Sequence, residues 1–233
     1  MVLSVFATTN IQIKSNEIIT KRKFFYLCLY LKEINKMKRI VLVLTLAVAS
    51  LLASAQTKVY KVGDYYNDGE REGVVFQVSD GGLHGKIVSL KQPSGELDWS
   101  NDEAEQARFI GATDSLNGAN NMKVVMAIDD WKQKYPAFAW CADLGSGWYL
   151  PSIEELRLLT LDDSVHDAVN ATLAAHKGIR LYNKRDMGWY WSSTEVESIK
   201  DGVYCAQMVR MVLCGVFSES KKNINYVCAV AAF

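Results

Sequence analysis

Predicted elements of one kind are grouped along this sequence and do not alternate with elements of the other kind. Two apolar, β-branched runs at 74–78 and 85–90 flank a DGG break at 80–82, which predicts a hairpin. Helical spacing follows over 100–176, and short aromatic or β-branched runs return after Gly188. This order favours an α+β fold with short antiparallel strands over a parallel βαβ sheet. A Rossmann-type site is not expected, since the sequence has no GxGxxG motif.

The helices are predicted from their first residues and from apolar spacing. Ser152 and Glu155 have the spacing of a capping box, in which each side chain accepts a hydrogen bond from the other residue's backbone N–H. Val165, Val169 and Leu173 are four residues apart, which places one apolar stripe on a helix. The expected helices are 100–108, beginning at Ser100 or Asn101, then 120–134, 136–144, 153–159 and 162–176; the expected C-terminal strands are 189–191, 203–205, 211–213 and 226–230.

The first quarter of the chain is not expected to belong to the folded domain. Met37-Lys38-Arg39 is a basic start, residues 40–52 form an apolar run of 13 residues, and Ala53-Ser54-Ala55 has the small-x-small pattern that signal peptidase recognises. The run is shorter than the roughly 20 residues that span a bilayer. We therefore expect a secretory signal over 37–55, cleaved near Ala55-Gln56, and a periplasmic or secreted product.

Residues 1–36 precede this signal, although a signal normally stands at the N-terminus. We interpret them as an upstream extension of the gene model, with translation starting at Met37. A membrane anchor over 24–31 is the alternative, but these eight residues are too few to span a bilayer. A lipid anchor would need a cysteine directly after the cleavage site, where the chain has Gln56. No stable membrane insertion is expected after cleavage.

The remaining part, residues 56–233, is long enough for one hydrophobic core and contains no Pro/Gly/Ser-rich linker or internal repeat. It carries 18 lysines and arginines against 24 aspartates and glutamates, a formal net charge of −6. Basic patches supply most of the affinity for nucleic acid, and here no basic run exceeds Lys221-Lys222. We expect one domain without nucleic acid as a partner.

Cysteines fall in this exported part in an even number: Cys141, Cys205, Cys214 and Cys228. Three connectivities are possible, and we favour Cys205–Cys214 with Cys141–Cys228. A hairpin turning at 209–210 would place Cys205 opposite Cys214, although Val-Arg offers no Gly or Asn for a positive φ. The second bridge would close a loop of nearly 90 residues, worth about 4 kcal/mol. The alternative is reduced, buried thiols.

The sequence predicts no metal, cofactor or catalytic group. His84, His166 and His176 lack HxxxH or HxH spacing, so a zinc site is not expected. DYYNDG at 64–69 departs from a calcium loop at its third position and at Val75, where a Glu would be needed, and favours a solvated turn. No cysteine stands in a CxxC motif, and no serine in a GxSxG motif.

The best ligand-binding candidates are Asp98, Trp99, Asn101 and Asp102. The oxygen-bearing side chains of this group favour a helix cap first, with a cation or polar ligand as the alternative. Trp99 is the best candidate for an exposed aromatic that stacks on a sugar, because polar residues surround it.

Two motifs carry a resemblance to a known family. AWCADLGSGWYLPSIEEL at 139–156 and YWSSTE at 190–195 together resemble the Lcl C-terminal-like family, a bacterial domain of unknown function, in the form of its exported Bacteroidetes-type members. The opening at 60–66 and the end at 226–230 also resemble this family, so the resemblance covers roughly 59–233. It implies a single C-type-lectin-like α+β domain with short antiparallel strands and two to four helices, with Trp148 and Trp191 in the core. The nested cysteine pairing also resembles the C-type-lectin order.

The resemblance implies no particular ligand. The namesake of the family is associated with sulfated glycans and surface adhesion, whereas a net negative domain repels such anions. Calcium-dependent C-type lectins bind sugar through Glu-Pro-Asn or Gln-Pro-Asp together with Trp-Asn-Asp. This chain has Gln92-Pro93-Ser94 and no Trp-Asn-Asp, so carbohydrate binding of that kind is not supported.

The sequence as a whole favours an exported, non-catalytic binding or adhesion module for a surface glycan or protein. Two alternatives stay open: a structural subunit of a fimbrial-tip type of assembly, and an enzyme that acts on polysaccharide through unrecognised carboxylates. Acids with a raised pKa in a deep pocket would favour the enzyme. An exposed apolar patch or an open sheet edge would favour the assembly, and a shallow groove with an exposed Trp99 would favour the binding module.

Overall fold

The computed structural model describes residues 32–34, 36–38, 40–41 and 58–233. The chain divides into two compact units, Met1–Thr57 and Lys58–Phe233. The expected upstream extension and signal, residues 1–36 and 37–55, fall almost entirely outside the described residues. Among those described, none of the helices has both the length and the apolar character needed to cross a membrane. The second unit carries the domain considered below.

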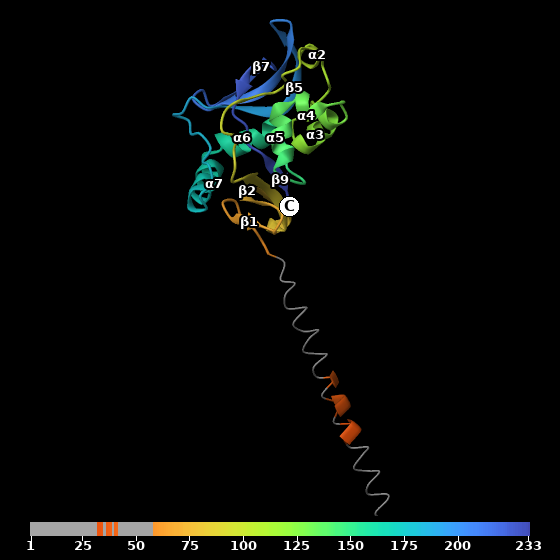
Figure 1. The fold of residues 1–233 in the computed structure, drawn as a ribbon. Coiled ribbons are helices and arrows are strands. Elements are labelled where there is room, and N and C mark those ends of the chain that lie inside the picture. The colour runs from red at the N-terminus through yellow and green to blue at the C-terminus, as the bar shows by residue number, and fades with distance from the viewer. Residues whose placement is uncertain (1–31, 35, 39, 42–57) are drawn as a thin grey trace, which may run out of the picture. The chain divides into compact units, whose positions relative to one another are not determined.

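A four-stranded antiparallel sheet holds both ends of this domain (Figure 1). Its strand order is β1-β2-β3-β9, so the last strand pairs beside the early hairpin. The hairpin prediction is confirmed, and its turn requires Gly82, because a Cβ there would lie 2.2 Å from the carbonyl oxygen of Tyr60. The elements are β1 (Tyr65–Asn67), β2 (Glu72–Ser79), the 3-10 turn η1 (Asp80–Gly82), β3 (His84–Ser89) and β9 (Val230–Ala232).

A three-stranded antiparallel sheet in the order β5-β6-β7 forms from the C-terminal part of the chain, and β4 pairs with β8. The predicted turn at 209–210 and strand at 211–213 are wrong, because β6 continues to Arg210 and residues 211–214 form the turn. The strand expected at 226–230 is also wrong, since only Val230 of that run belongs to a strand. The strands are β4 (Leu97–Asp98), β5 (Trp189–Lys200), β6 (Val203–Arg210), β7 (Gly215–Ser220) and β8 (Ile224–Asn225).

The helices expected at 136–144, 153–159 and 162–176 are confirmed to within two residues at each end, whereas the one expected at 100–108 is shorter, Glu103–Gln106. The Ser152–Glu155 capping box is confirmed, and Val165, Val169 and Leu173 are buried as expected. The predicted helix 120–134 is divided, because Asp130 has a positive φ of 56°. The helices are α2 (Glu103–Gln106), α3 (Gly118–Met126), α4 (Trp131–Lys134), α5 (Pro136–Asp143), α6 (Ile153–Leu161) and α7 (Asp163–Ala175); four of them have eight residues or more.

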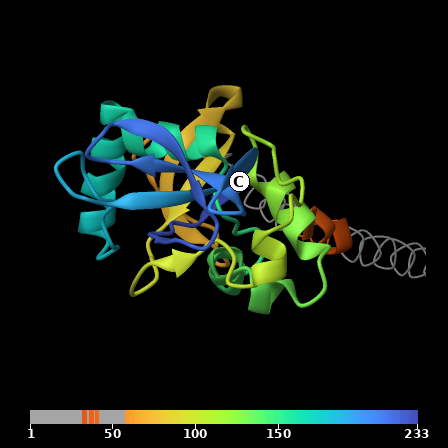
Figure 2. The same cartoon turned by 90° about the horizontal axis from the view of Figure 1, so that it is seen from above.

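One core joins the helices to both larger sheets. Helix α6 packs against β5 and β6, and α7 packs against β2. In both views α3, α4 and α5, drawn in green, lie together on one side of the domain (Figures 1 and 2). Trp148 and Trp191 of the two motifs are buried, as expected. The mixed α+β class with antiparallel sheets is therefore confirmed.

Candidate ligand-binding cleft

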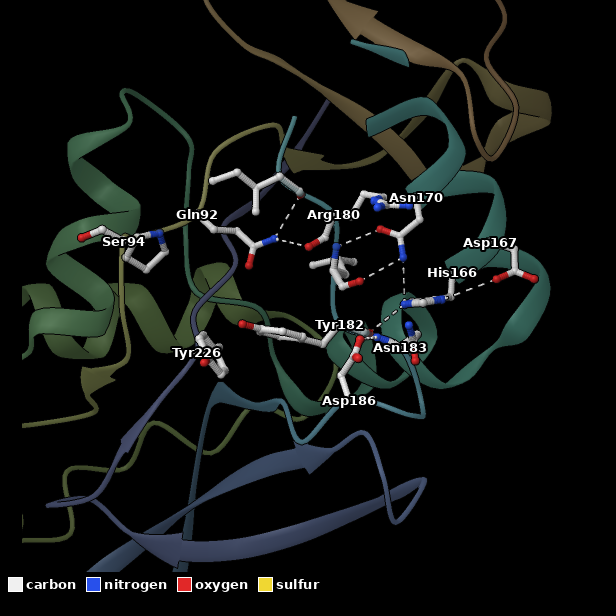
Figure 3. Close-up of a pocket in the computed structure, with 13 residues that line it drawn as sticks. Gln92, Ser94, His166, Asp167, Asn170, Arg180, Tyr182, Asn183, Asp186 and Tyr226 are labelled. Carbon is white, nitrogen blue, oxygen red and sulfur yellow. Dashed lines mark hydrogen bonds and ion pairs between the residues drawn. The ribbon is translucent and has the colours of Figure 1, made fainter. Parts of the chain in front are cut away.

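A cavity of about 720 Å³ is lined by α7 and the loop that follows it, together with two segments far from them in the sequence (Figure 3). Helix α7 supplies residues between 166 and 170, and the loop after it supplies residues from 179 to 186. The opposite wall comes from 92–94, after β3, and from Tyr226, after β8. The volume is in the range of sites that bind small molecules.

Asn170 on α7 holds the loop that forms one wall of the cleft. Its Oδ1 accepts a hydrogen bond from the backbone N–H of Leu181 at 2.8 Å, and its Nδ2 donates to the carbonyl oxygen of the same residue at 3.1 Å. This amide therefore satisfies both polar groups of one loop residue, as a neighbouring strand would. These two hydrogen bonds fix the position of the loop along this wall.

His166 lies one turn earlier on the same helix and holds the next loop residue. Its Nε2 is 3.0 Å from the carbonyl oxygen of Tyr182. The same Nε2 is 3.1 Å from Nδ2 of Asn170, so the ring tautomer decides whether it donates to the carbonyl oxygen or accepts from the amide. The other ring nitrogen, Nδ1, is 3.7 Å from Oδ1 of Asp167, whose side chain is 86% exposed. The imidazole is almost buried and acts by positioning Tyr182.

Gln92 ties the opposite wall to the same loop. Its Nε2 donates to the carbonyl oxygens of Ile179 at 3.1 Å and Arg180 at 3.3 Å. Its Oε1 accepts from the Tyr190 hydroxyl at 3.2 Å, and that hydroxyl accepts from the backbone N–H of Tyr182 at 3.1 Å. Burial raises the pKa of Tyr190, so its hydroxyl stays protonated and keeps this donor role. The 92–94 segment, which departs from the lectin tripeptides, is thus part of the cleft.

Two tyrosines form the aromatic wall. The ring centroids of Tyr182 and Tyr226 are 4.5 Å apart with an interplanar angle of 53°, and Figure 3 shows the rings side by side. A hydrogen bond to Tyr182, together with burial, raises the pKa of Tyr226 to about 12. Both the ring face and a protonated hydroxyl are therefore offered to a ligand at neutral pH.

The rim of the cleft carries charges of both signs. Arg180 and Asp167 are exposed. The turn beside them is held by Asp186, whose Oδ2 accepts from the Asn183 backbone at 2.8 Å, and by Asn183, whose Oδ1 accepts from the Arg185 backbone at 2.7 Å. The rim therefore offers both donors and acceptors, which suits a polar ligand with several hydroxyl or amide groups.

The four residues predicted to bind a ligand do not line this cleft. The expectation that Trp99 is exposed is wrong: it is fully buried, and its Nε1 donates to the carbonyl oxygen of Ser192 at 2.9 Å. Polar neighbours in the sequence do not prevent burial, because Tyr135 and Phe138 pack edge-on against the ring and the neighbouring Ser100 is buried with it. Asp98 belongs to β4, and Asn101 is exposed. Asp102 caps α2 by accepting from the Glu105 backbone at 3.0 Å, in place of the predicted Ser100 or Asn101.

Five carboxyl groups of the domain have a pKa that departs from its ordinary value. Polysaccharide-cleaving enzymes need a carboxylic acid with a raised pKa as proton donor. Within 58–233, each of these shifted carboxyl pKa values lies below the ordinary value of its group. They belong to Asp68, Glu105, Asp114, Asp162 and Glu219. In the same part of the chain, no group of three or more His, Cys, Asp or Glu side chains is arranged to hold a metal ion.

The four cysteines of the domain are unpaired thiols in this structure. The register that suggested Cys205–Cys214 is wrong, because Cys205 lies opposite Ser220 and Cys214 lies in the turn beyond β6. Cys141 and Cys228 are both fully buried, and Sγ of Cys141 is 4.0 Å from the carbonyl oxygen of Cys228. The pairing of these two stays a prediction.

Comparison with known families and with curated proteins found no match to this chain. The resemblance to the Lcl C-terminal-like family thus rests on the motifs at 139–156 and 190–195. The fold and the cleft together define an α+β domain with a polar, tyrosine-lined cleft.

Proposed function

We propose that residues 56–233 form an exported, non-catalytic binding module of the C-type-lectin-like, Lcl C-terminal-like kind. Its ligand is a glycan or a protein segment at the cell surface, bound in the cleft between α7 and 92–94. The secretory pattern at 37–55 supports the location. The two family motifs support the assignment, because each contributes a tryptophan, Trp148 or Trp191, to the core.

The observation that carries the binding role is the way the cleft loop is held. Asn170, His166 and Gln92 all use their side chains to hold backbone groups of 179–182. A preformed loop avoids the entropic cost of ordering on binding. The groups that remain for a ligand are the Tyr226 ring and hydroxyl and the polar side chains at the rim. An aromatic face with planar polar groups beside it is the chemistry that binds a sugar ring.

The proposal is tested with purified residues 56–233 on a glycan array, followed by calorimetric titration of the best binder. Tyr226→Ala removes the aromatic wall and is expected to weaken binding at least tenfold. Tyr65→Ala removes a half-buried tyrosine of β1 outside the cleft and is expected to leave it unchanged. A chelator is expected to have no effect. A blank array would exclude a glycan as the ligand. Glycan binding that survives Tyr226→Ala would place the binding site outside this cleft.

A structural subunit of a surface assembly is the second candidate, and two observations favour it. Strand β7 stands at the edge of its sheet in the order β5-β6-β7. The turn that precedes it exposes 45% of Val212 and 56% of Leu213. An open edge beside exposed apolar residues is typical of strand addition between chains. Analytical ultracentrifugation over a range of concentrations tests it, since assembly predicts association that Leu213→Lys abolishes.

A further inference from the structure

A second groove, of about 520 Å³, lies among α3, α4, α5 and the loop at 145–149. It shares no residue with the tyrosine-lined cleft. Its three helices belong to the group drawn in green in Figure 1. Its volume suits a small molecule, and its lining is largely apolar.

Two methionines and two tryptophans form the walls of this groove. Met122 and Trp148 are nearly buried, whereas Trp131 is half-buried and Met126 is 52% exposed. Met126 leaves an apolar side chain open to the groove, and an apolar ligand that covered it would gain from removing that surface from water. Methionine is unbranched and adapts its shape to an apolar partner. The walls therefore suit a flexible hydrocarbon better than a hydroxyl-rich sugar, whose polar groups would lose hydrogen bonds there.

Both charged side chains that line the groove are lysines, although the domain as a whole has a net charge of −6. Nζ of Lys132 is 2.6 Å from Oδ1 of Asp143 and 5.8 Å from the Trp131 ring centroid, so its charge is already paired. Nζ of Lys123 contacts only Oδ1 of Asn120, at 3.3 Å, and makes no ion pair with any residue in the described part of the chain. Lys123 is therefore available to an anion.

The loop side of the groove leaves room for a ligand. Apart from Gly145 and its two chain neighbours, no atom of the described residues lies within 4 Å of the position that a Cβ of Gly145 would take, and the φ of 128° there disfavours any side chain. An apolar trough with one unpaired cation is complementary to an amphiphile with a single anionic head.

We propose that this groove binds a medium-chain fatty carboxylate, with its alkyl chain along Met122, Met126 and Trp131 and its carboxylate on Lys123. The site goes beyond the proposed function, because it uses other residues and another class of ligand. It adds a lipid-derived ligand to a domain whose cleft takes polar groups. Failure of one site leaves the other standing.

The test uses residues 56–233 and follows tryptophan fluorescence and heat during titration with decanoate below its critical micelle concentration. Saturable binding is expected, with octanoate weaker and dodecanoate tighter, because a fully buried methylene is worth about fourfold in affinity. Decanol is expected to bind less tightly than decanoate, and decyltrimethylammonium least of all. Absence of saturable decanoate binding overturns the proposal.

Matched variants locate the ligand. Lys123→Ala is expected to weaken the affinity for decanoate about two- to fivefold and to leave the affinity for decanol unchanged, because only the carboxylate head group pairs with the lysine. Lys222→Ala, an exposed lysine outside the groove, is the charge control. Met126→Gln is expected to weaken the binding of both ligands. Leu116→Gln changes an exposed apolar residue outside the groove and is expected to leave the binding of both unchanged. Each variant is checked for an unchanged Tm.

Two outcomes of these variants count against the site. Decanoate binding that is lost on Tyr226→Ala but kept in Met126→Gln would move the amphiphile to the tyrosine-lined cleft. Equal loss of decanoate and decanol in Lys123→Ala would remove the role of the lysine in binding the carboxylate.

Discussion

Lys221 and Glu195 form an ion pair in which both side chains are fully buried. The Glu195 carboxylate also accepts from the backbone N–H groups of Ile110 at 2.9 Å and Gly111 at 2.8 Å. Nζ of Lys221 donates to the carbonyl oxygen of Arg108 at 2.7 Å. The pair thus joins the segment after α2 to strand β5 and to the residue that follows β7. Burial lowers the pKa of Lys221, although the carboxylate opposes that shift.

Breaking this pair from one side is expected to destabilise the domain. Lys221→Met leaves the Glu195 carboxylate buried without its cation, at a cost of about 3–5 kcal/mol. Glu195→Gln leaves the ammonium group unpaired, at a similar cost. The double variant is expected to cost clearly less than the sum of the two, because neither partner is then a buried lone charge. Urea unfolding monitored by circular dichroism measures all three.

The control for this set is Lys222→Met at the exposed neighbouring lysine, which is expected to change the free energy of unfolding by no more than about 0.5 kcal/mol. Strict additivity of the two single variants would show that the charges do not depend on each other.

The lowered pKa of Glu105 predicts how the stability of the domain depends on pH. Burial acts to raise the pKa of this carboxyl, but hydrogen bonds from Tyr135 and Arg108 outweigh it and hold the pKa below its usual value of 4.5. The folded carboxyl is therefore harder to protonate than the unfolded one. Its contribution to stability is complete above the unfolded pKa and is lost as the pH falls through the folded pKa. The stability difference between wild type and Glu105→Gln is expected to narrow below about pH 4.5.

Urea titrations at several pH values between neutrality and acid measure this difference. Glu103→Gln, an exposed residue on the same helix, is the control and is expected to show no such narrowing. A difference between wild type and Glu105→Gln that stays constant with pH would mean that the pKa is the same in both states.

Local patterns in the sequence predicted the elements that depend on near neighbours. The capping box at Ser152 and the stripe of Val165, Val169 and Leu173 were found because caps and helix faces are set by residues three or four positions apart. The division of helix 120–134 was missed, because an Asp with positive φ leaves no mark in the pattern.

The cleft could not be predicted, since no spacing within one segment indicates it. Asn170 holds Leu181 across a loop, and Gln92 reaches the same loop from nearly 90 positions away. The exposure of Trp99 was predicted wrongly because only its polar sequence neighbours were considered. In the structure, Tyr135 and Phe138 from a distant segment pack edge-on against its ring. Features set by residues a few positions apart could therefore be predicted from the sequence, whereas contacts between distant segments could not.

The capping box has one member that does more than cap. Oε1 of Glu155 accepts from Lys86 at 2.6 Å and from the Tyr149 hydroxyl at 2.9 Å, while Oε2 accepts from Ser152 at 2.7 Å and Gly118 at 3.0 Å. Ser152→Ala is expected to cost about 1 kcal/mol, as for an ordinary cap. Glu155→Gln is expected to cost about 3 kcal/mol, because an amide has only one accepting atom and leaves buried donors unpaired.

Urea unfolding of the two variants measures this ranking. Glu154→Gln is the control, since its exposed side chain pairs only with Arg157 on the surface. If Ser152→Ala cost as much as Glu155→Gln, the carboxylate would have no role beyond the cap.

The thiols are expected to separate into two classes of reactivity. Cys214 is exposed, whereas Cys141, Cys205 and Cys228 are buried. Burial raises the pKa of Cys228 to about 12 and that of Cys141 well above its usual value, so few reactive thiolates form at these sites. Iodoacetamide at pH 8 is therefore expected to label only Cys214 in the folded domain, as measured by mass spectrometry.

Labelling in denaturant, with and without a reductant, then tests the predicted bridge between Cys141 and Cys228. If the exported protein contains it, these two cysteines are labelled only after reduction, while Cys205 is labelled in denaturant alone. Cys228→Ser in the oxidised protein is then expected to cost about 4 kcal/mol, because the bridge closes a long loop of the unfolded chain. Labelling of Cys141 in denaturant without reductant would instead show two reduced, buried thiols.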